Sequence, residues 1–273
     1  MADVTPSKPD LDLIQEELRD LARPIVEAAG NPPEPFGVYL FRADTPEAKL
    51  GRYIEDTVFG EWFGNSSELI ESEYGPYDES TYFIVVIDHL RHLPAGTIRV
   101  NLPSERGLKT LADIENVWQR DLAPVLDRTG LAWDRNLVWD VVTVAVHADY
   151  RGKATDGMIS LAMYQAVVRS LLRGGAHWFV CILDLHVVQL MQDLTSKPFS
   201  TFAGVEPIEY LDSPASNAFW CDLDEYGPRL RAADEFIHGV LFEGVGIEAV
   251  VREASYEVAE EMAARIPVEV RLT

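Results

Sequence analysis

The chain of 273 residues is 47% hydrophobic and 25% charged, and these proportions exclude a wholly disordered or collagen-like protein. Its 23 Lys and Arg against 45 Asp and Glu give a net charge of −22. A field of this sign repels nucleic acid and anionic membranes, so we expect neither as a partner.

Cysteine content and the terminal sequence indicate the compartment. The two cysteines, Cys181 and Cys221, are too few for a disulfide framework, which favours free thiols in a reducing environment. The N-terminus lacks the basic and apolar segments of a signal peptide, and no run approaches about 20 apolar residues. We therefore expect a cytoplasmic protein without a membrane span.

The first predicted helix covers residues 11–29, where apolar residues recur at steps of three and four with acidic residues between them. Pro24 is expected to kink or split this helix. The run NPPEP at 31–35 can continue neither a helix nor a central strand, so a boundary is expected there. The predicted organisation is an N-terminal helical extension and linker in 1–35, a main domain in 36–228 and a C-terminal helical extension in 229–273.

Strands and helices alternate through the main domain. In chain order we predict a strand at 36–41, a helix at 46–62, strands at 82–88 and 96–102, a helix at 108–126, a strand at 137–146, a helix at 158–172, a strand at 176–183, a helix at 187–194 and strands at 208–211 and 218–223. The stretch at 137–146 has too few polar breaks for a surface strand, so we expect a central strand covered on both faces. The tail at 232–264 is expected to be helical with one break, at Gly244 and Gly246.

The loop HADYRGKATDG at 147–157 joins the predicted central strand to a helix that is apolar nearly all round. Backbone N–H groups at a helix start are unsatisfied and carry the positive end of the helix dipole, so the loop predicts an anion site, most naturally for phosphate. Arg151 and Lys153 add cationic donors, and Gly152 and Gly157 let the backbone approach a ligand closely. The alternative is a solvated turn with two surface cations.

The order of strand, Tyr-Arg-Gly-Lys loop, buried helix, strand, helix and closing strand pair resembles the GNAT acyltransferase superfamily. In that superfamily the backbone amides of a loop of the pattern Q/R-x-x-G-x-G/A hold the pyrophosphate of acyl-CoA. The sequence matches through Val144, Val146, Tyr150, Arg151, Gly152 and Lys153. It departs where Ala154 replaces the first motif glycine and Asp156 the second, unless a one-residue insertion aligns Gly157. The implied fold is α/β, with a mixed, mostly antiparallel central sheet flanked by helices.

Within this superfamily, residues 36–223 resemble the branch of acyl-homoserine-lactone synthases and long-chain N-acyl amino acid synthases. The early strands match through Gly96, Thr97, Arg99 and Pro103, and VWDVVTVAV resembles the branch's W-E-V-S-R-L-A-V. In that motif Asp140 replaces a glutamate, Val142 a serine and Thr143 an arginine.

The resemblance implies a donor site along the central strand and the loop after it. The pantetheine arm of the donor is expected to pair with the backbone of this strand like an added strand. The predicted donor-binding residues are Val144, Val146, Arg151, Gly152, Lys153, Ala154, Thr155 and Gly157. Asp140 is the candidate general base, because burial among apolar residues would raise the pKa of its carboxyl. The alternative is a structural carboxylate satisfied by backbone amides or by Arg99.

The predicted acceptor or acyl pocket comprises Trp62, Phe63, Arg99 and Thr143. Trp62 and Phe63 follow the first helix of the main domain, where the branch lines this pocket; the alternative for both is core packing. The histidine spacings match no metal-ligand pattern, so we expect neither a metal nor a tightly bound cofactor. Acyl-CoA is expected as co-substrate in preference to acyl carrier protein, because a carrier protein is itself acidic.

Two functions are compatible with these residues. The first is an N-acyltransferase that moves an acyl group from a thioester to an amine by direct attack with general-base assistance. The second is a degenerate GNAT-fold protein that binds acyl-CoA or a small metabolite as a sensor or assembly subunit. The second is favoured by the departures at Ala154, Asp156 and Thr143, and by Leu194, which stands where many members of the superfamily have a tyrosine that protonates the leaving thiolate. The terminal helices or the closing strands offer surfaces for a homodimer.

Overall fold

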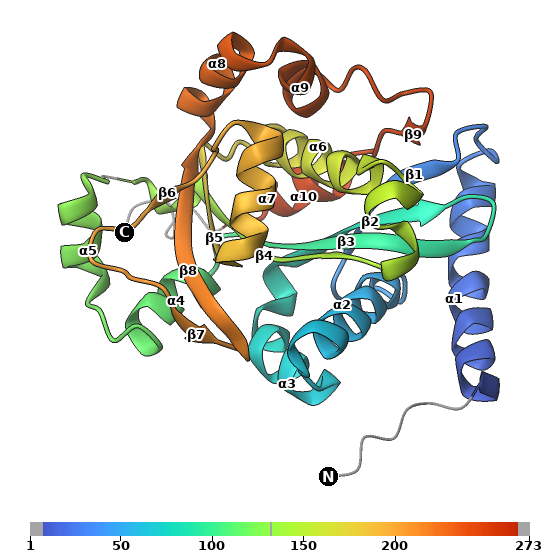
Figure 1. Cartoon of the computed structure of the whole chain (residues 1–273), viewed down its shortest axis with the longest axis horizontal. Coiled ribbons are helices and arrows are strands. Elements are labelled where there is room, and N and C mark those ends of the chain that lie inside the picture. The colour runs from blue at the N-terminus through green and yellow to red at the C-terminus, as the bar shows by residue number, and fades with distance from the viewer. Residues whose placement is uncertain (1–7, 132, 267–273) are drawn as a thin grey trace.

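The computed structural model describes residues 8–131 and 133–266. Within these residues a single sheet of nine strands has the order β6-β8-β5-β4-β3-β2-β1-β9, with β7 also paired to β8 (Figure 1). The strands are β1 (Phe36–Arg42), β2 (Thr81–Asp88), β3 (Leu93–Asn101), β4 (Val138–Val146), β5 (Trp178–Asp184), β6 (Ser200–Thr201), β7 (Ile208–Tyr210), β8 (Ser213–Asp222) and β9 (Val251–Arg252).

Most neighbouring strands of the sheet run antiparallel. In the described chain the parallel pairs are β4 with β5 and the short β9 with β1. Parallel neighbours need a crossover connection, which the helix α6 (Met158–Arg173) supplies between β4 and β5. The mixed, mostly antiparallel sheet expected from the sequence is therefore confirmed.

Helices cover both faces of this sheet (Figure 1). The face that we call the α2 face carries α1 (Lys8–Ala28), α2 (Ala48–Phe63), α3 (Ser67–Tyr74), α4 (Lys109–Asn116) and α5 (Leu122–Thr129). The opposite face, the α6 face, carries α6, α7 (Leu185–Thr195) and α10 (Glu257–Ala264), with α8 (Leu223–Ala233), α9 (Glu235–His238) and the π-helical turn η5 (Gly239–Glu243) beyond them. Short 3₁₀ turns are η1 (Gly75–Ser80), η2 (Arg135–Leu137), η3 (Ala148–Tyr150) and η4 (Gly152–Ala154).

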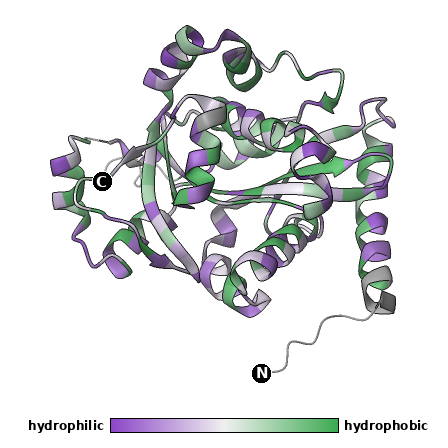
Figure 2. Ribbon diagram, viewed as in Figure 1, coloured by the Kyte–Doolittle hydropathy of each residue, from purple (hydrophilic) through white to green (hydrophobic). Residues whose placement is uncertain are grey.

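The core is divided by the sheet. The largest apolar cluster lies between the sheet and α6, and smaller clusters lie under α1 and α2 and under α4 and α5. Figure 2 shows hydrophilic residues on the outward sides of helices such as α1 and α5. The central position predicted for β4 is confirmed, because helices pack on both of its faces.

Two predicted helices differ from the structure. The single helix expected at 108–126 is two helices, α4 and α5, separated at Gln119 by a left-handed φ of 54°. The intervening Trp118 is buried, and its Nε1 donates to the carbonyl of Glu206 at 2.8 Å, so a long-range contact ends the first helix. Conversely, Pro24 does not split α1, because Leu18, Ala22 and Val26 pack on the sheet on both sides of it.

The closing strand pair also has a different turn from the expected one. β8 begins at Ser213, so the segment DSPASN is mostly strand, and the reversal occurs at Leu211 and Asp212, whose φ angles are 47° and 61°. Asn65 donates from Nδ2 to the Leu211 carbonyl and to Asp212 Oδ2, both at 3.1 Å. A side chain about 150 residues away in sequence therefore fixes this turn.

The C-terminal extension is less regular than predicted. In place of a helix with one break, the described part of the chain after Asp222 contains α8, α9, η5, the short β9 and α10. Gly244 ends η5 with a φ of 75°, and Gly246 follows with a φ of 107°. Backbone in this region of φ favours glycine, so the break falls where the sequence indicated.

Candidate functional site

The parallel strands β4 and β5 pair over a short distance only. The pairing joins residues 138–140 of β4 to 178–180 of β5, and the remaining part of β4 pairs only with β3. The β3–β4 register shifts so that Val142 lies opposite no partner, which makes it a β-bulge. From Val141 onward, the edge of β4 that faces β5 is therefore open to another extended chain.

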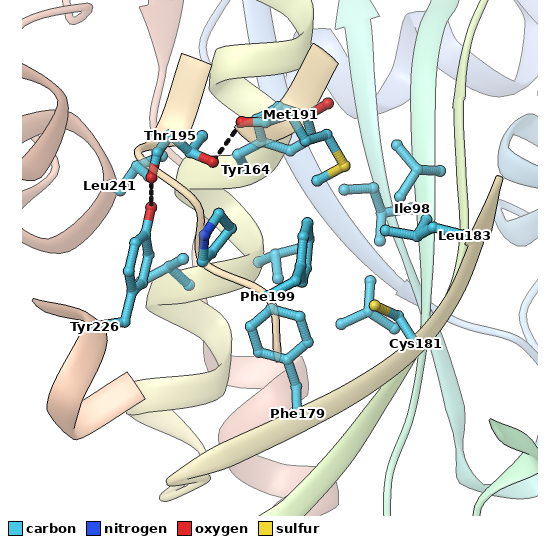
Figure 3. Close-up of a pocket in the computed structure, with 15 residues that line it drawn as sticks. Ile98, Tyr164, Phe179, Cys181, Leu183, Met191, Thr195, Phe199, Tyr226 and Leu241 are labelled. Atoms are coloured by element: carbon cyan, nitrogen blue, oxygen red, sulfur yellow. Dashed lines mark hydrogen bonds between the residues drawn. The ribbon is translucent and has the colours of Figure 1, made fainter. Parts of the chain in front are cut away.

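An apolar pocket of about 50 Å³ lies where these strands separate, on the α6 face (Figure 3). It is lined by Ile98 of β3, Val141 and Val144 of β4, Tyr164, Val167 and Val168 of α6, Phe179, Cys181 and Leu183 of β5, Met191 and Thr195 of α7, Pro198, Phe199, Tyr226 of α8 and Leu241 of η5. The hydroxyl of Tyr226 donates to the Thr195 carbonyl at 2.7 Å, and that of Thr195 donates to the Met191 carbonyl at 2.6 Å. With these hydroxyls occupied, the pocket suits a hydrocarbon group.

The predicted donor loop lies next to this pocket, at the start of α6. Gly152 and Gly157 have positive φ angles of 54° and 75°. In the described structure the backbone N–H groups of Asp156, Gly157, Ile159 and Ser160 donate to no acceptor, and α6 has no side-chain cap. These free donors at the start of a 16-residue helix form the geometry of an anion site.

Arg151 connects the loop to the central strand. Its Nε donates to the carbonyl of Val146 at 2.6 Å, and its guanidinium lies over the Trp62 ring, 5.4 Å from the ring centre. Its Nη2 is buried without a hydrogen-bond partner among the described residues. Lys153 and Ala154 are exposed, whereas Thr155 donates from Oγ1 to the Tyr150 carbonyl at 2.8 Å. The structure thus brings Trp62, Val146 and Arg151 together.

Asp140 is the last residue of β4 that pairs with β5, and it is fully buried on the α2 face. Its Oδ2 accepts from the backbone N–H of Thr110 and its Oδ1 accepts from the Thr110 hydroxyl, both at 2.7 Å. Burial raises the pKa of Asp140 to about 7, while the two hydrogen bonds from Thr110 oppose the increase. The structure therefore contains both features considered for Asp140: a raised pKa and a carboxylate held by the backbone of α4.

Arg99 and Thr143 belong to a buried ionic network on the α2 face. Arg99 forms a bidentate pair with Glu55 of α2, with 3.1 Å from Nε to Oε1 and 2.6 Å from Nη2 to Oε2. The Thr143 hydroxyl also donates to Glu55 Oε1. The Arg99 guanidinium lies over the rings of Phe83 and Tyr74, at 4.7 and 5.1 Å. Because the pair is surrounded by aromatic rings, its mutual attraction is weakly screened.

None of the four residues predicted for the acceptor or acyl pocket lines the apolar pocket. Arg99 and Thr143 lie on the opposite face of the sheet, Phe63 contacts Phe59, and Trp62 covers Arg151. Their role toward an acceptor stays a prediction. The Leu194 side chain, at which the sequence departs from the family pattern, lies outside the described residues.

The sequence analysis missed two groups of residues. Glu55 lies in an ordinary amphipathic helix pattern, and no local signal distinguishes its burial from solvent exposure. Most of the pocket residues come from α6, β5, α7, α8 and η5; α8 was not predicted, and the other segments were predicted separately, without a common pocket. Only Val144 was predicted as a site residue and also lines the pocket.

Neither a metal-binding cluster nor a membrane-spanning helix occurs in the described part of the chain. No group of three or more His, Cys, Asp or Glu side chains is arranged to hold a metal ion there. Over the same residues, no helix is both long and apolar enough to cross a bilayer.

Comparison with known proteins gives matches at the level of structure. No family model and no curated protein matches the sequence. The N-acyl amino acid synthase FeeM from uncultured soil microbes superposes with a TM-score of 0.53 and 15% identity, over 74% of this chain and 97% of FeeM. The CoA-dependent acyl-homoserine lactone synthase BjaI has a TM-score of 0.47 and 16% identity, over 82% of this chain and 98% of BjaI. The acyl-homoserine lactone synthase LasI has a TM-score of 0.48 and 14% identity, over 78% of this chain and 98% of LasI.

At these identities the superposition on FeeM defines the architecture and not the substrate. The chain therefore has a GNAT-like fold, a mixed central sheet flanked by helices.

Proposed function

We propose that the protein is an N-acyltransferase that moves an acyl group from a thioester donor to an amine. The observation that carries this proposal is the position of the apolar pocket, between two diverging strands and beside a helix start with free N–H donors. A thioester of CoA has the matching parts in the same order: phosphates, an amide-bearing arm and an acyl chain.

The donor phosphates would bind at the start of α6. The four free N–H groups there supply hydrogen bonds, and the unpartnered Arg151 Nη2 adds a cationic donor. Lys153 is exposed beside them and adds charge. Local donors of this kind hold an anion although the chain as a whole carries −22.

The pantetheine arm would lie along the open edge of β4, from Val146 toward Val141. Its amides can pair with the strand as an added chain does, because β5 occupies this edge only as far as Asp140. The acyl chain would then enter the apolar pocket past Val144. At the Val142 bulge, backbone N–H groups freed from the ladder can stabilise the oxygen of the tetrahedral intermediate.

The chemistry is a direct displacement. The amine nitrogen attacks the thioester carbonyl carbon and the proton of the amine passes to a base; the C–S bond then breaks, and the sulfur leaves as a thiolate that takes up one proton to become the thiol. Asp140 is the proposed base because it is the last residue of β4 before β4 and β5 diverge and because its pKa is raised to about 7. It would have to release one of its two hydrogen bonds from Thr110 to accept this proton.

Acyl-CoA is the proposed donor in preference to acyl carrier protein. A carrier protein is acidic, so docking it on a chain of net charge −22 would require a local basic surface. CoA needs only the few donors at the start of α6.

A second function, acyl-CoA sensing without turnover, is favoured by one observation. Both oxygens of Asp140 are already hydrogen-bonded, and no Asp, Glu or His belongs to the apolar pocket. This protein would bind the donor as described and leave its thioester intact.

Thiol release separates the two functions. The protein is incubated with acyl-CoA donors of increasing chain length and a panel of amines and amino acids, and binding of each donor is measured by calorimetry. Release that depends on the amine supports the transferase, and binding without release supports the sensor. If no acyl-CoA binds, both functions are wrong.

The role of Asp140 is tested by Asp140→Asn and Thr110→Val. If Asp140 is the base, the first variant lowers kcat by about 10²- to 10⁴-fold with the donor affinity unchanged. Thr110→Val removes a hydrogen bond that lowers the pKa of Asp140, so the acidic limb of the rate profile moves to higher pH. If kcat survives in Asp140→Asn, Asp140 only positions α4.

A further inference from the structure

The inner end of the apolar pocket is closed by a single turn of π-helix. Leu241, in η5, reaches the pocket beside Tyr226, while Ile98 and Leu183 mark the other end (Figure 3). Leu241 is 2% exposed and Tyr226 is 3% exposed, so the pocket does not continue to solvent at this end. A chain that enters from the side of β4 therefore stops at these residues.

The π-helical turn is anchored by Phe242, the residue that follows Leu241 within it. The Phe242 carbonyl accepts a hydrogen bond from Arg169 Nη1 of α6 at 3.1 Å. The Phe242 ring is stacked on His238, with 5.1 Å between ring centres, and contacts Tyr226 at 5.7 Å. Any Cβ at Gly227 would lie 3.0 Å from the same ring. The turn that carries Leu241 is therefore packed against α6 and α8 through Phe242.

The widened turn explains how two large adjacent residues serve different neighbours. A π-helical turn holds more residues than an α-helical turn, which changes the directions of the side chains that follow it. Leu241 lies in the pocket, whereas Phe242 packs between α8 and His238. The side chain at the end of the pocket thus comes from the C-terminal extension, outside the main domain.

The chemistry of this end of the pocket is entirely hydrocarbon. The Tyr226 and Thr195 hydroxyls both donate to backbone carbonyls, and Leu241 offers only methyl groups. A carboxylate or hydroxyl at the end of an acyl chain would lose its hydration there without gaining a partner. This end of the pocket therefore selects for length and also against a polar chain end.

We propose that Leu241 sets the maximum length of the acyl group and that the pocket accepts acyl groups with a hydrocarbon end. This inference rests on the proposed binding of an acyl thioester in the pocket. It assigns a specificity-determining role to η5, a segment that contributes nothing to the predicted donor loop.

The test is a calorimetric titration of saturated acyl-CoA donors of increasing length into the wild type, Leu241→Ala and Leu241→Phe. Each methylene buried should increase affinity by about fourfold until the chain meets Leu241. In Leu241→Ala, the longest acyl chain that still gains affinity should be about two to three carbons longer than in the wild type, and in Leu241→Phe it should be shorter. Pentanoyl-CoA should bind at least about tenfold more tightly than succinyl-CoA, which has a carboxylate end.

Two further variants control for folding and position. Leu241→Val removes less volume, so it covers the case in which Leu241→Ala does not fold, and it should extend the maximum acyl length by about one carbon. Leu190→Ala makes the same substitution on α7, where Leu190 is 58% exposed and lies outside the pocket. It should leave the dependence of affinity on acyl chain length unchanged.

The outcomes separate this inference from the function that it rests on. A longer maximum acyl length in Leu241→Ala or Leu241→Val, with that of Leu190→Ala unchanged, supports the role of Leu241. If all variants bind the acyl-CoA series with the wild-type maximum length, Leu241 does not set that length. If succinyl-CoA binds as well as pentanoyl-CoA, the pocket does not require a hydrocarbon end. In both cases the proposed function stands. If no thioester binds to the wild type, both are wrong.

Discussion

Strand β4 separates two interiors of opposite chemistry. On the α6 face, Val141 and Val144 line an apolar pocket to which no Asp, Glu or His among the described residues contributes. On the α2 face, Asp140 and Thr143 belong to a buried polar network in which Arg99 is paired with Glu55. The buried ion pair and the apolar pocket thus lie on opposite faces of the same strand.

The residues that stand out in the sequence by their charge and the free volume of a pocket thus need not lie on the same face of a sheet. A buried charge persists only with partners around it, so the α2 face is occupied by its own contacts. An apolar chain is recognised by space and hydrocarbon contact, which the α6 face provides. The network holds β4 in place, and the pocket beside it is left for a ligand.

The largest expected effect comes from breaking the buried pair. Glu55→Ala leaves Arg99, which is 1% exposed, without its bidentate partner, so we expect a loss of about 3–5 kcal/mol in the free energy of unfolding, measured in urea. The matched control is Asp44→Ala at the more exposed Arg42–Asp44 pair, with an expected loss below about 1 kcal/mol. Equal losses in the two variants would contradict the contrast between the faces.

The next effect is on the apolar face. Val144→Phe places a ring in the mouth of the pocket, so the affinity for acyl-CoA should fall at least about tenfold in calorimetry. Val117→Phe makes the same substitution at a site that is 41% exposed and should leave the affinity unchanged. Retained affinity in Val144→Phe would exclude this pocket as the acyl site.

A smaller effect concerns the pH dependence of stability. Because the pKa of Asp140 is raised to about 7, the folded state holds a proton between about pH 4 and 7 that the unfolded chain has released. Stability from this group therefore falls as pH rises through that window, by at most about 1.4 kcal/mol per pH unit.

The measurement is a set of urea titrations between pH 4 and 8. Asp140→Asn should remove this part of the slope, whereas Asp127→Asn, at an exposed position on α5, should retain it. Identical slopes in the wild type and Asp140→Asn would mean that Asp140 is ionised throughout the window.

The smallest effect is expected at the donor loop. Lys153 is exposed, so Lys153→Ala should weaken acyl-CoA binding by only about two- to fivefold, more at low salt than at high salt. Arg128→Ala removes an equally exposed cation from α5 and should have no effect. A matching loss in both variants would indicate a general charge effect rather than a phosphate site.

Local patterns predicted much of the fold. The strand, loop and helix from Val138 to Arg173 lie within one residue of their predicted bounds, because hydrophobic periodicity and glycine are local signals. The break between α4 and α5 and the turn at Leu211 were missed, since Trp118 and Asn65 determine them through distant partners.

From the sequence alone we could predict most of the order of elements and the burial of Asp140, and the anion site at the loop before α6 stays a prediction. Which side chains lie on the same face of the sheet depends on the tertiary structure, because strand pairing and the bulge at Val142 set the direction of each side chain of β4. It separated Arg99 and Thr143 from the pocket, buried Glu55 and brought Leu241 to the pocket's end. Composition and spacing fix the segments, but a pocket is a property of surfaces that meet only after packing.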